Sequence, residues 1–139
     1  KIDIVQIPFN LYNQEFLTTK SILKIKNENC KIQVRSIYLQ GLLINSYLNW
    51  PSWINKEHID HHKRLLEYCN NINYSLLDLN LCFLKSFEFI DDLIIGISSL
   101  KEIKQFKKSW DRNLKLENFD YKLWNIENKD FNDPRRWPS

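Results

Sequence analysis

The chain has 139 residues, which is the length of one domain. Its 43% hydrophobic and 27% charged residues exclude disordered and collagen-like classes. The net charge of +3 comes from basic and acidic residues scattered along the chain, so we expect no nucleic-acid partner. No apolar run has the length of a membrane span, and residues 1–20 lack the organisation of a signal peptide. These features predict a cytoplasmic protein with no membrane partner.

The sequence begins at Lys1 and contains no methionine. We therefore expect a processed chain, a fragment or a sequence from which pieces are omitted. Three cysteines, Cys30, Cys69 and Cys82, have no CxxC spacing and are odd in number. This usage predicts reduced thiols that pack in the interior rather than disulfides or metal ligands.

The first predicted elements are a strand and a helix. Residues 2–9 form a short β-branched run, which predicts a strand. Asn10 or Asn13 can then cap a helix over residues 14–27. Asn29 follows this helix and is a residue type that tolerates the left-handed conformation of a helix end.

A second strand and two helices come next. Residues 31–38 predict the strand, and Gly41 in the following loop can adopt a backbone angle that other residues resist. We predict one helix at about residues 54–70. A further helix, residues 76–87, begins after Ser75, which is a plausible N-cap.

The last predicted elements are a strand at residues 91–97 and a helix at residues 100–110. The strand is a continuous apolar run, which is typical of a strand covered on both faces, and Ser98 or Ser99 can cap the helix. Strands that alternate with helices favour a parallel sheet. Three parallel strands leave two open edges, so we predict that residues 1–139 are one partial domain of a larger α/β protein and pair or aggregate in isolation.

Ligands of α/β sheets bind where the strands end, and three such junctions stand out, at residues 6–10, 35–43 and 95–99. The last junction places a glycine and two hydroxyls before a helix, an arrangement that favours phosphate binding. The same pattern is also typical of an ordinary turn and helix cap.

Five segments then occur in an order typical of one family: VQIPFNLYNQEF, VRSIYLQGLL, LDLNLCFL, LIIGISSLKEI and NDPRRW. The chain resembles the C-terminal part of the aldo/keto reductases, especially bacterial members associated with surface-sugar metabolism. The resemblance implies strands six to eight, with their helices, of a (β/α)8 TIM barrel. It also implies an oxidoreductase that binds NADPH, less often NADH, and transfers hydride to a small aldehyde or ketone.

The resemblance further implies a set of cofactor-binding residues: Gln6, Arg35, Ser36, Tyr38, Gln40, Gly41, Gly96, Ser98, Ser99 and Lys101. Gln6 matches the family's contact to the nicotinamide carboxamide. Arg35 stands where many members stack an aromatic ring on the nicotinamide, and an arginine plane can also stack. Residues 36–41 match the loop along the pyrophosphate, and residues 96–99 match the segment that holds the adenosine phosphate.

Two positions depart from the family pattern. Phe106 stands where many relatives carry an asparagine that holds adenine. Lys101 is a candidate partner of a ribose 2′-phosphate, but it lies beside Glu102, and an acid there favours NADH. The choice between NADP and NAD therefore stays open.

The family's catalytic Asp, Tyr, Lys and His lie on the first strands of the barrel, and none of their motifs occurs in these 139 residues. We therefore predict no catalytic residue in this chain and expect it to be inactive without the N-terminal part of the barrel. An alternative is a non-catalytic regulatory or scaffold protein with the same fold. Arg35 and Phe106, at two cofactor positions, favour this alternative.

Other patterns have both a functional and a structural interpretation. His58 and His62 are one helical turn apart and could hold a metal, but Ile59 stands where the zincin pattern needs glutamate. We expect a partly exposed helix face and no metal. Residues 101–108 could read phosphate, and a solvated helix face is the simpler interpretation. The five tryptophans could stack on bases or sugars, but we expect them to pack helices and tail against the barrel.

Overall fold

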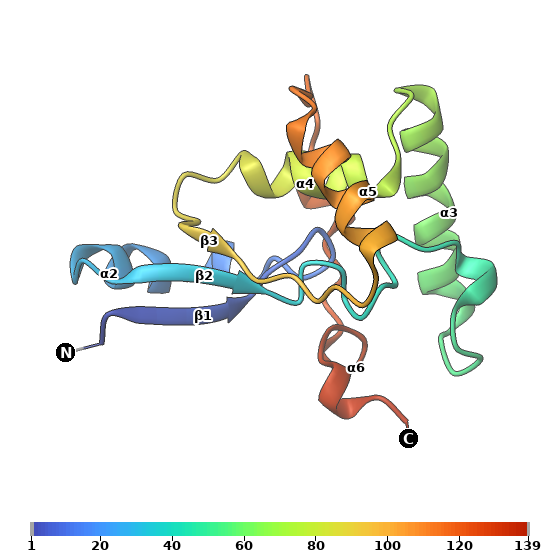
Figure 1. Ribbon diagram of the computed structural model, residues 1–139. Helices are drawn as coiled ribbons and strands as arrows, with labels where there is room; N and C mark the ends of the chain where they lie inside the picture. The colour runs from blue at the N-terminus through green and yellow to red at the C-terminus, as the bar shows by residue number, and fades with distance from the viewer. Residues whose placement is uncertain (1, 139) are drawn as a thin grey trace.

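A computed structural model describes residues 2–138, which form a small α/β protein around an open sheet of three parallel strands (Figure 1). The strands are β1 (Ile4–Pro8), β2 (Lys31–Arg35) and β3 (Asp92–Leu93), in the order β1-β2-β3. The helices are α1 (Glu15–Thr18), α2 (Ser21–Asn27), α3 (Lys56–Asn71), α4 (Leu76–Lys85), α5 (Leu100–Asp111) and α6 (Lys129–Asn132). Short 3-10 helices span Tyr47–Asn49, Tyr121–Trp124 and Pro134–Arg136. The predicted element order and parallel pairing are confirmed, and within residues 2–138 the sheet remains open.

The sheet has one buried and one exposed face. Ile7 pairs with Val34 in the register of β1 and β2, and both side chains are buried. On the opposite face Gln6 pairs with Gln33, which pairs in turn with Asp92 of β3. Because β-strand side chains alternate between faces, the apolar row packs toward the helices and the polar row lies on the uncovered side. Parallel sheets are ordinarily covered on both faces, so this uncovered face is unusual.

The core lies on the apolar side of the sheet, where α4 packs over the ends of the strands. Leu79 and Phe83 of α4 are fully buried, and the Phe83 ring stacks on Phe9 with their centroids 5.4 Å apart. Ser75 caps α4 as predicted, and its hydroxyl and backbone exchange hydrogen bonds with Asp78 in a capping box. Residue identity thus fixes both the start of this helix and its buried face.

The predicted helix over residues 14–27 is divided into α1 and α2. Thr19 ends α1 because its backbone is extended, with φ −102° and ψ 148°. The prediction that Asn10 or Asn13 caps the helix is wrong, since Gln14 occupies the cap position. The Asn10 carboxamide oxygen instead accepts the N–H groups of Tyr12 and Asn13 and holds the loop after β1. The left-handed end predicted at Asn29 is confirmed, with φ 53°.

The two later strands are shorter than predicted. Strand β2 ends at Arg35 because Ser36 adopts φ +57° and turns the chain out of the sheet. The strand predicted over residues 91–97 is reduced to β3, whose last residue, Leu93, pairs with Val34 near the end of β2. It is also not covered on both faces, since the side chains of Ile94 and Ile97 are about 37% and 40% exposed.

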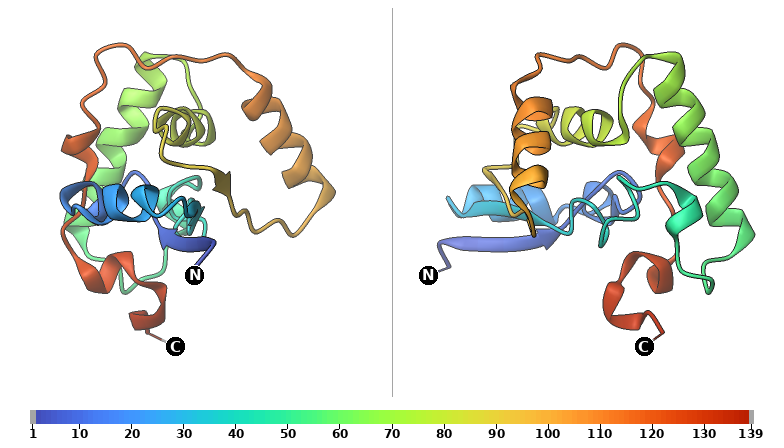
Figure 2. Two further views of the ribbon diagram at one scale, coloured as in Figure 1. Left: turned by 90° about the vertical axis from the view of Figure 1, so that its left-hand side faces the viewer. Right: turned by 45° about the vertical axis from the view of Figure 1, so that its right-hand side comes forward.

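The last long helix, α5, stands away from the sheet and packs beside α4 (Figure 2). Ser99 caps it as predicted by accepting the Glu102 N–H. Every residue of α5 is exposed or half-buried. None of the helices in residues 2–138 combines the length and the apolar character needed to cross a membrane.

Candidate functional site: a cavity at the carboxyl ends of the strands

A large cavity of about 1350 Å³ lies beside the carboxyl ends of β2 and β3. Its walls come from the loop after β2, the facing ends of α3 and α4, the loop after β3, and α5. Seven of the predicted cofactor residues line it: Arg35, Ser36, Tyr38, Gln40, Gly41, Gly96 and Ser98. The two loops are far apart in sequence, and the parallel pairing of β2 with β3 brings them together.

The loop after β2 is folded tightly by a series of left-handed residues. Ser36, Leu39 and Gln40 have φ between 46° and 57°, and Gly41 has φ +90°. The backbone angle of Gly41 strongly favours glycine, and a Cβ here would also lie 2.9 Å from the Asn45 Nδ2 atom, so the Asn45 side chain would have to move. The loop is therefore a preorganised wall of the large cavity.

Two side chains on this wall have defined polar properties. Burial raises the pKa of Tyr38 to about 12, so its hydroxyl remains protonated at neutral pH and can donate a hydrogen bond. Arg35 is exposed and contacts the Ser36 hydroxyl at 3.3 Å. The wall therefore presents a neutral donor and a cation to the cavity.

The loop after β3 forms the opposite wall and ends at the start of α5. The Glu102 carboxylate accepts the Ser98 N–H at 2.7 Å and the Ser98 hydroxyl at 2.9 Å. These hydrogen bonds lower the pKa of Glu102, so its charge is held at the entrance to the helix. Glu102 itself lines the cavity.

An ion pair between a buried aspartate and an exposed arginine lies on the cavity wall and was missed by sequence reasoning. Arg112 Nη1 donates to Asp78 Oδ2 at 2.6 Å, and the Asp78 side chain is 4% exposed. Burial opposes ionisation of Asp78, but hydrogen bonds from Ser75 and the charge of Arg112 bring its pKa below the ordinary value. The spacing of Ser75 and Asp78 fits a capping box and could have drawn attention to Asp78, whereas nothing in the sequence indicated Arg112.

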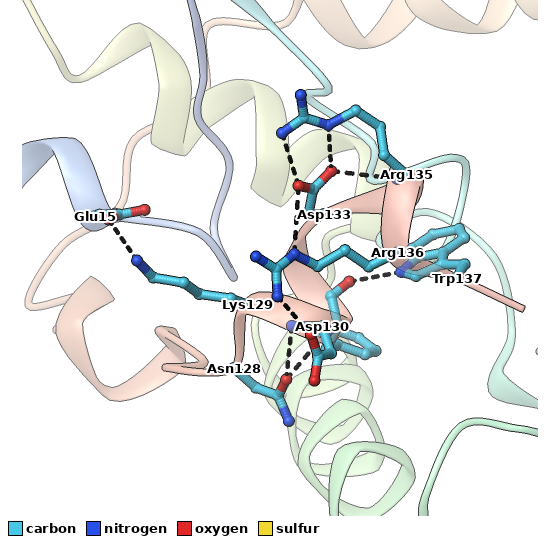
Figure 3. A network of polar contacts seen from close by, with 9 residues as sticks. Glu15, Asn128, Lys129, Asp130, Asp133, Arg135, Arg136 and Trp137 are labelled. Carbon is cyan, nitrogen blue, oxygen red and sulfur yellow. Dashed lines mark hydrogen bonds and ion pairs between the residues drawn. The ribbon is translucent and has the colours of Figure 1, made fainter.

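A second, small cavity of about 590 Å³ shares Arg35 and Ser36 with the large one. Its remaining lining comes from the end of β1, from α1 and from the C-terminal segment 125–136. Surface ion pairs connect residues of this segment (Figure 3), with Asp133 bound by Arg135 at 2.7 Å and Asp130 by Arg136 at 2.9 Å. The Arg135 hydrogen bonds lower the pKa of Asp133 to about 2. Arg35 therefore stands between two cavities.

Three predicted cofactor residues lie outside the lining of both cavities. Gln6 is on the uncovered face of the sheet, where its amide donates to the Gln33 oxygen at 3.1 Å. Ser99 is committed to capping α5, and Lys101 is exposed on that helix. The structure thus brings the two predicted phosphate-binding loops together but does not bring these three side chains to the cavity.

The histidine pair on α3 is not the partly exposed helix face that the sequence suggested. His58 and His62 are both buried. The two His62 ring nitrogens lie 2.7 Å from the Tyr12 hydroxyl and 3.0 Å from the Asn45 carbonyl oxygen. Residues 2–138 contain no cluster of three metal-ligating side chains. Packing and hydrogen bonding thus explain these histidines.

The remaining sequence patterns differ in burial, and within residues 101–108 both Phe106 and Lys108 line the large cavity. Trp50 is buried and donates to the Leu42 carbonyl, and Trp137 donates to the Phe131 carbonyl. The lysines of residues 101–108 are exposed, as expected for a solvated helix face. The cysteines are free thiols, of which Cys82 is only half-buried.

Comparison with known proteins gives no assignment. No family model matches the sequence, and no curated protein matches it.

Proposed function

We propose that this chain is the C-terminal part of an NAD(P)-dependent aldo/keto reductase and supplies strands six to eight of its (β/α)8 barrel. The observation that supports this most directly is the large cavity, whose two walls are the loops expected to bind the cofactor. A cavity at the carboxyl ends of parallel strands is where α/β proteins bind ligands.

The shape of the sheet supports a barrel as well. The uncovered face carries Ile4 at about 49% exposure, together with the polar row of Gln6 and Gln33. In a closed barrel this face would line the interior, and further strands would pair with the free edges. The side chains that are exposed on α5 would then face the helices of the rest of the barrel.

The cofactor would supply hydride chemistry, and the residues of this chain would bind and orient it. Tyr38 and the backbone of the Gly41 loop would hold the pyrophosphate, and the loop at Ser98 would hold the adenosine end. Gln6, on the face that would line the barrel, would contact the nicotinamide carboxamide. The proton donor would come from the tetrad, which lies outside this chain.

A non-catalytic protein with the same fold is the second candidate. Arg35 lines the cavity at the position where many relatives place an aromatic ring. The ring of Phe106 stacks on that of Trp110, with their centroids 5.6 Å apart. A stacked Phe106 offers adenine an aromatic surface but no hydrogen bond. These two positions favour a protein that binds a dinucleotide and has lost turnover.

The test is dinucleotide binding by the full-length gene product, followed by turnover with a panel of aldehydes and ketones. We expect quenching of tryptophan fluorescence on titration with NADH or NADPH. Gly41→Val should weaken binding by about ten-fold or more, because its Cβ would displace Asn45 and its φ would be strained. Leu23→Ala, on the exposed surface of α2, is the matched control and should leave binding unchanged.

Failure of the folded protein to bind either dinucleotide at low salt would contradict both candidates. Binding without turnover of any carbonyl compound would favour the non-catalytic candidate.

A further inference from the structure

Arg35 carries an uncompensated positive charge at the small cavity. Four basic residues line this cavity, and three of them have a carboxylate partner (Figure 3). Lys129 pairs with Glu15 at 3.6 Å, whereas Arg135 and Arg136 pair with aspartates at 2.7 Å and 2.9 Å. Arg35 forms no ion pair in the part of the chain that the structure describes. Its guanidinium is therefore free to bind an anion.

The sheet fixes the position of this arginine. Arg35 is the last residue of β2, where it pairs with Pro8 of β1, and its carbonyl accepts the Phe9 N–H at 3.2 Å. The side chain is exposed and contacts the Ser36 hydroxyl at 3.3 Å. The backbone of Arg35 is thus held in place, and most of the donors on its guanidinium are left for a ligand.

Two carboxamide side chains in the lining of the small cavity add neutral donors. The Asn125 oxygen accepts the Gln14 N–H at 2.9 Å, and the Asn13 oxygen accepts the Glu15 N–H at 3.4 Å. These hydrogen bonds use the oxygens and so orient both carboxamides. Neither NH2 group donates to another group within residues 2–138, so both can donate to a ligand.

We propose that the small cavity binds a small molecule that carries a carboxylate, and that Arg35 binds this carboxylate beside the carboxamides of Asn13 and Asn125. The cavity volume of about 590 Å³ lies within the usual range for ligand pockets. A planar guanidinium matches a carboxylate through two parallel hydrogen bonds. Four basic and three acidic residues line the cavity, which leaves an excess of one positive charge. This excess fits a single carboxylate better than a phosphate, which carries about two negative charges at neutral pH.

This site goes beyond the proposed function and does not depend on it. It gives Arg35 a partner other than the nicotinamide ring on which the resemblance would stack it. Arg35 and Ser36 line both cavities, so a carboxylate bound here would lie beside the ligand of the large cavity. In a reductase that neighbour would be the cofactor, and the molecule in the small cavity would be a carbonyl substrate that carries a carboxylate.

The experiment measures the dissociation constant of pyruvate for the full-length gene product by isothermal titration calorimetry, with no dinucleotide present. Pyruvate has one carboxylate, and its methyl ester is the matched ligand without the charge. We expect saturable binding of pyruvate, and binding of the ester that is weaker by about ten-fold or more. Arg35→Gln should weaken pyruvate binding by a similar factor. Lys24→Gln, which removes an exposed charge outside both cavities, is the matched control and should leave pyruvate binding unchanged.

A second variant assigns the ligand to the small cavity, because Asn125 lines this cavity and not the large one. Asn125→Asp retains an acceptor for the Gln14 N–H but replaces the free donor with a negative charge. It should weaken pyruvate binding by about ten-fold or more.

Unchanged pyruvate binding in either Arg35→Gln or Asn125→Asp would overturn the proposal. So would equal affinities for pyruvate and its ester, tighter binding of inorganic phosphate than of pyruvate, or no saturable binding of pyruvate by the folded protein. Failure to bind a dinucleotide would contradict the proposed function and leave this site standing.

Discussion

Two regions of the molecule have similar patterns of apolar residues, but these side chains are buried in one region and exposed in the other. In the core region, formed by β1, β2 and α4, side chains such as Ile32 and Leu79 are completely buried. In the β3–α5 arm (residues 92–111), helix α5 stands away from the sheet (Figure 2). There Leu100 is 66% exposed and Ile103 is 47% exposed. Helices α4 and α5 both have apolar residues at helical spacing. The difference shows that an apolar pattern is buried only where a second surface covers it.

The largest effect that we expect is a difference in the free energy of unfolding between two leucine-to-alanine variants, one in each region. Leu79→Ala removes a fully buried side chain from α4 and should lower the free energy of unfolding by about 2–5 kcal/mol. Leu100→Ala, on the arm, should change it by less than about 0.5 kcal/mol. Urea unfolding followed by circular dichroism measures both, and equal losses would contradict the division into two regions.

A smaller effect is expected from the loop that joins the core region to the cavity. The Asn10 side chain accepts two backbone N–H groups and donates to the Ser36 carbonyl at 2.9 Å. Asn10→Ala leaves these groups unpaired in a buried site, so it should cost about 1–3 kcal/mol of stability. The same unfolding experiment tests it, and an unchanged denaturation midpoint would show that the loop does not depend on Asn10.

Acid should destabilise the fold through the histidines of α3, which packs beside the core region, and the arm carries no histidine. Burial lowers the pKa of His62 to about 4, below the value of about 6.5 expected in the unfolded chain. The unfolded chain therefore binds more protons between these values, so stability is fully present above pH 6.5 and falls as the pH falls toward 4. His58 and His61 are shifted in the same direction, also mainly by burial. Unfolding midpoints at several pH values should show a shallower acid slope for His62→Gln.

The smallest effect is expected on the arm itself. Lys107 pairs with Asp111 one turn along α5 at 2.7 Å, and both side chains are largely exposed. Lys107→Ala should therefore lower stability by less than about 0.5 kcal/mol, and high salt should remove even that difference. A loss above about 1 kcal/mol, measured by urea unfolding, would show that α5 contributes more to the fold of this chain than its exposure indicates.

The sequence predicted the order of the elements well because local chemistry determines them. Ser75 and Ser99 begin their helices and Asn29 ends one, as their side chains and backbone preferences require. The length of β3 could not be predicted in this way. It depends on where β2 leaves the sheet, which is determined by the turn at Ser36 in another part of the chain.

The candidate site was only partly predictable for a similar reason. The two loops at Ser36 and Ser98 were identified from strand ends and from the resemblance. The ion pair of Asp78 with Arg112 joins residues 34 positions apart, and it forms because α5, which Arg112 directly follows, packs beside α4. Lys101 and Glu102 could not be distinguished without knowing which side of α5 faces the cavity.

We propose that the rest of a barrel covers the β3–α5 arm in the full-length gene product, which would account for the exposure of this arm in residues 2–138. Hydrogen exchange of the full-length gene product, read by mass spectrometry, tests this directly. The claim predicts that amides of Leu100–Asp111 are protected as strongly as those of Leu76–Lys85 in the core region. Rapid exchange along Leu100–Asp111, with Leu76–Lys85 still protected, would contradict it.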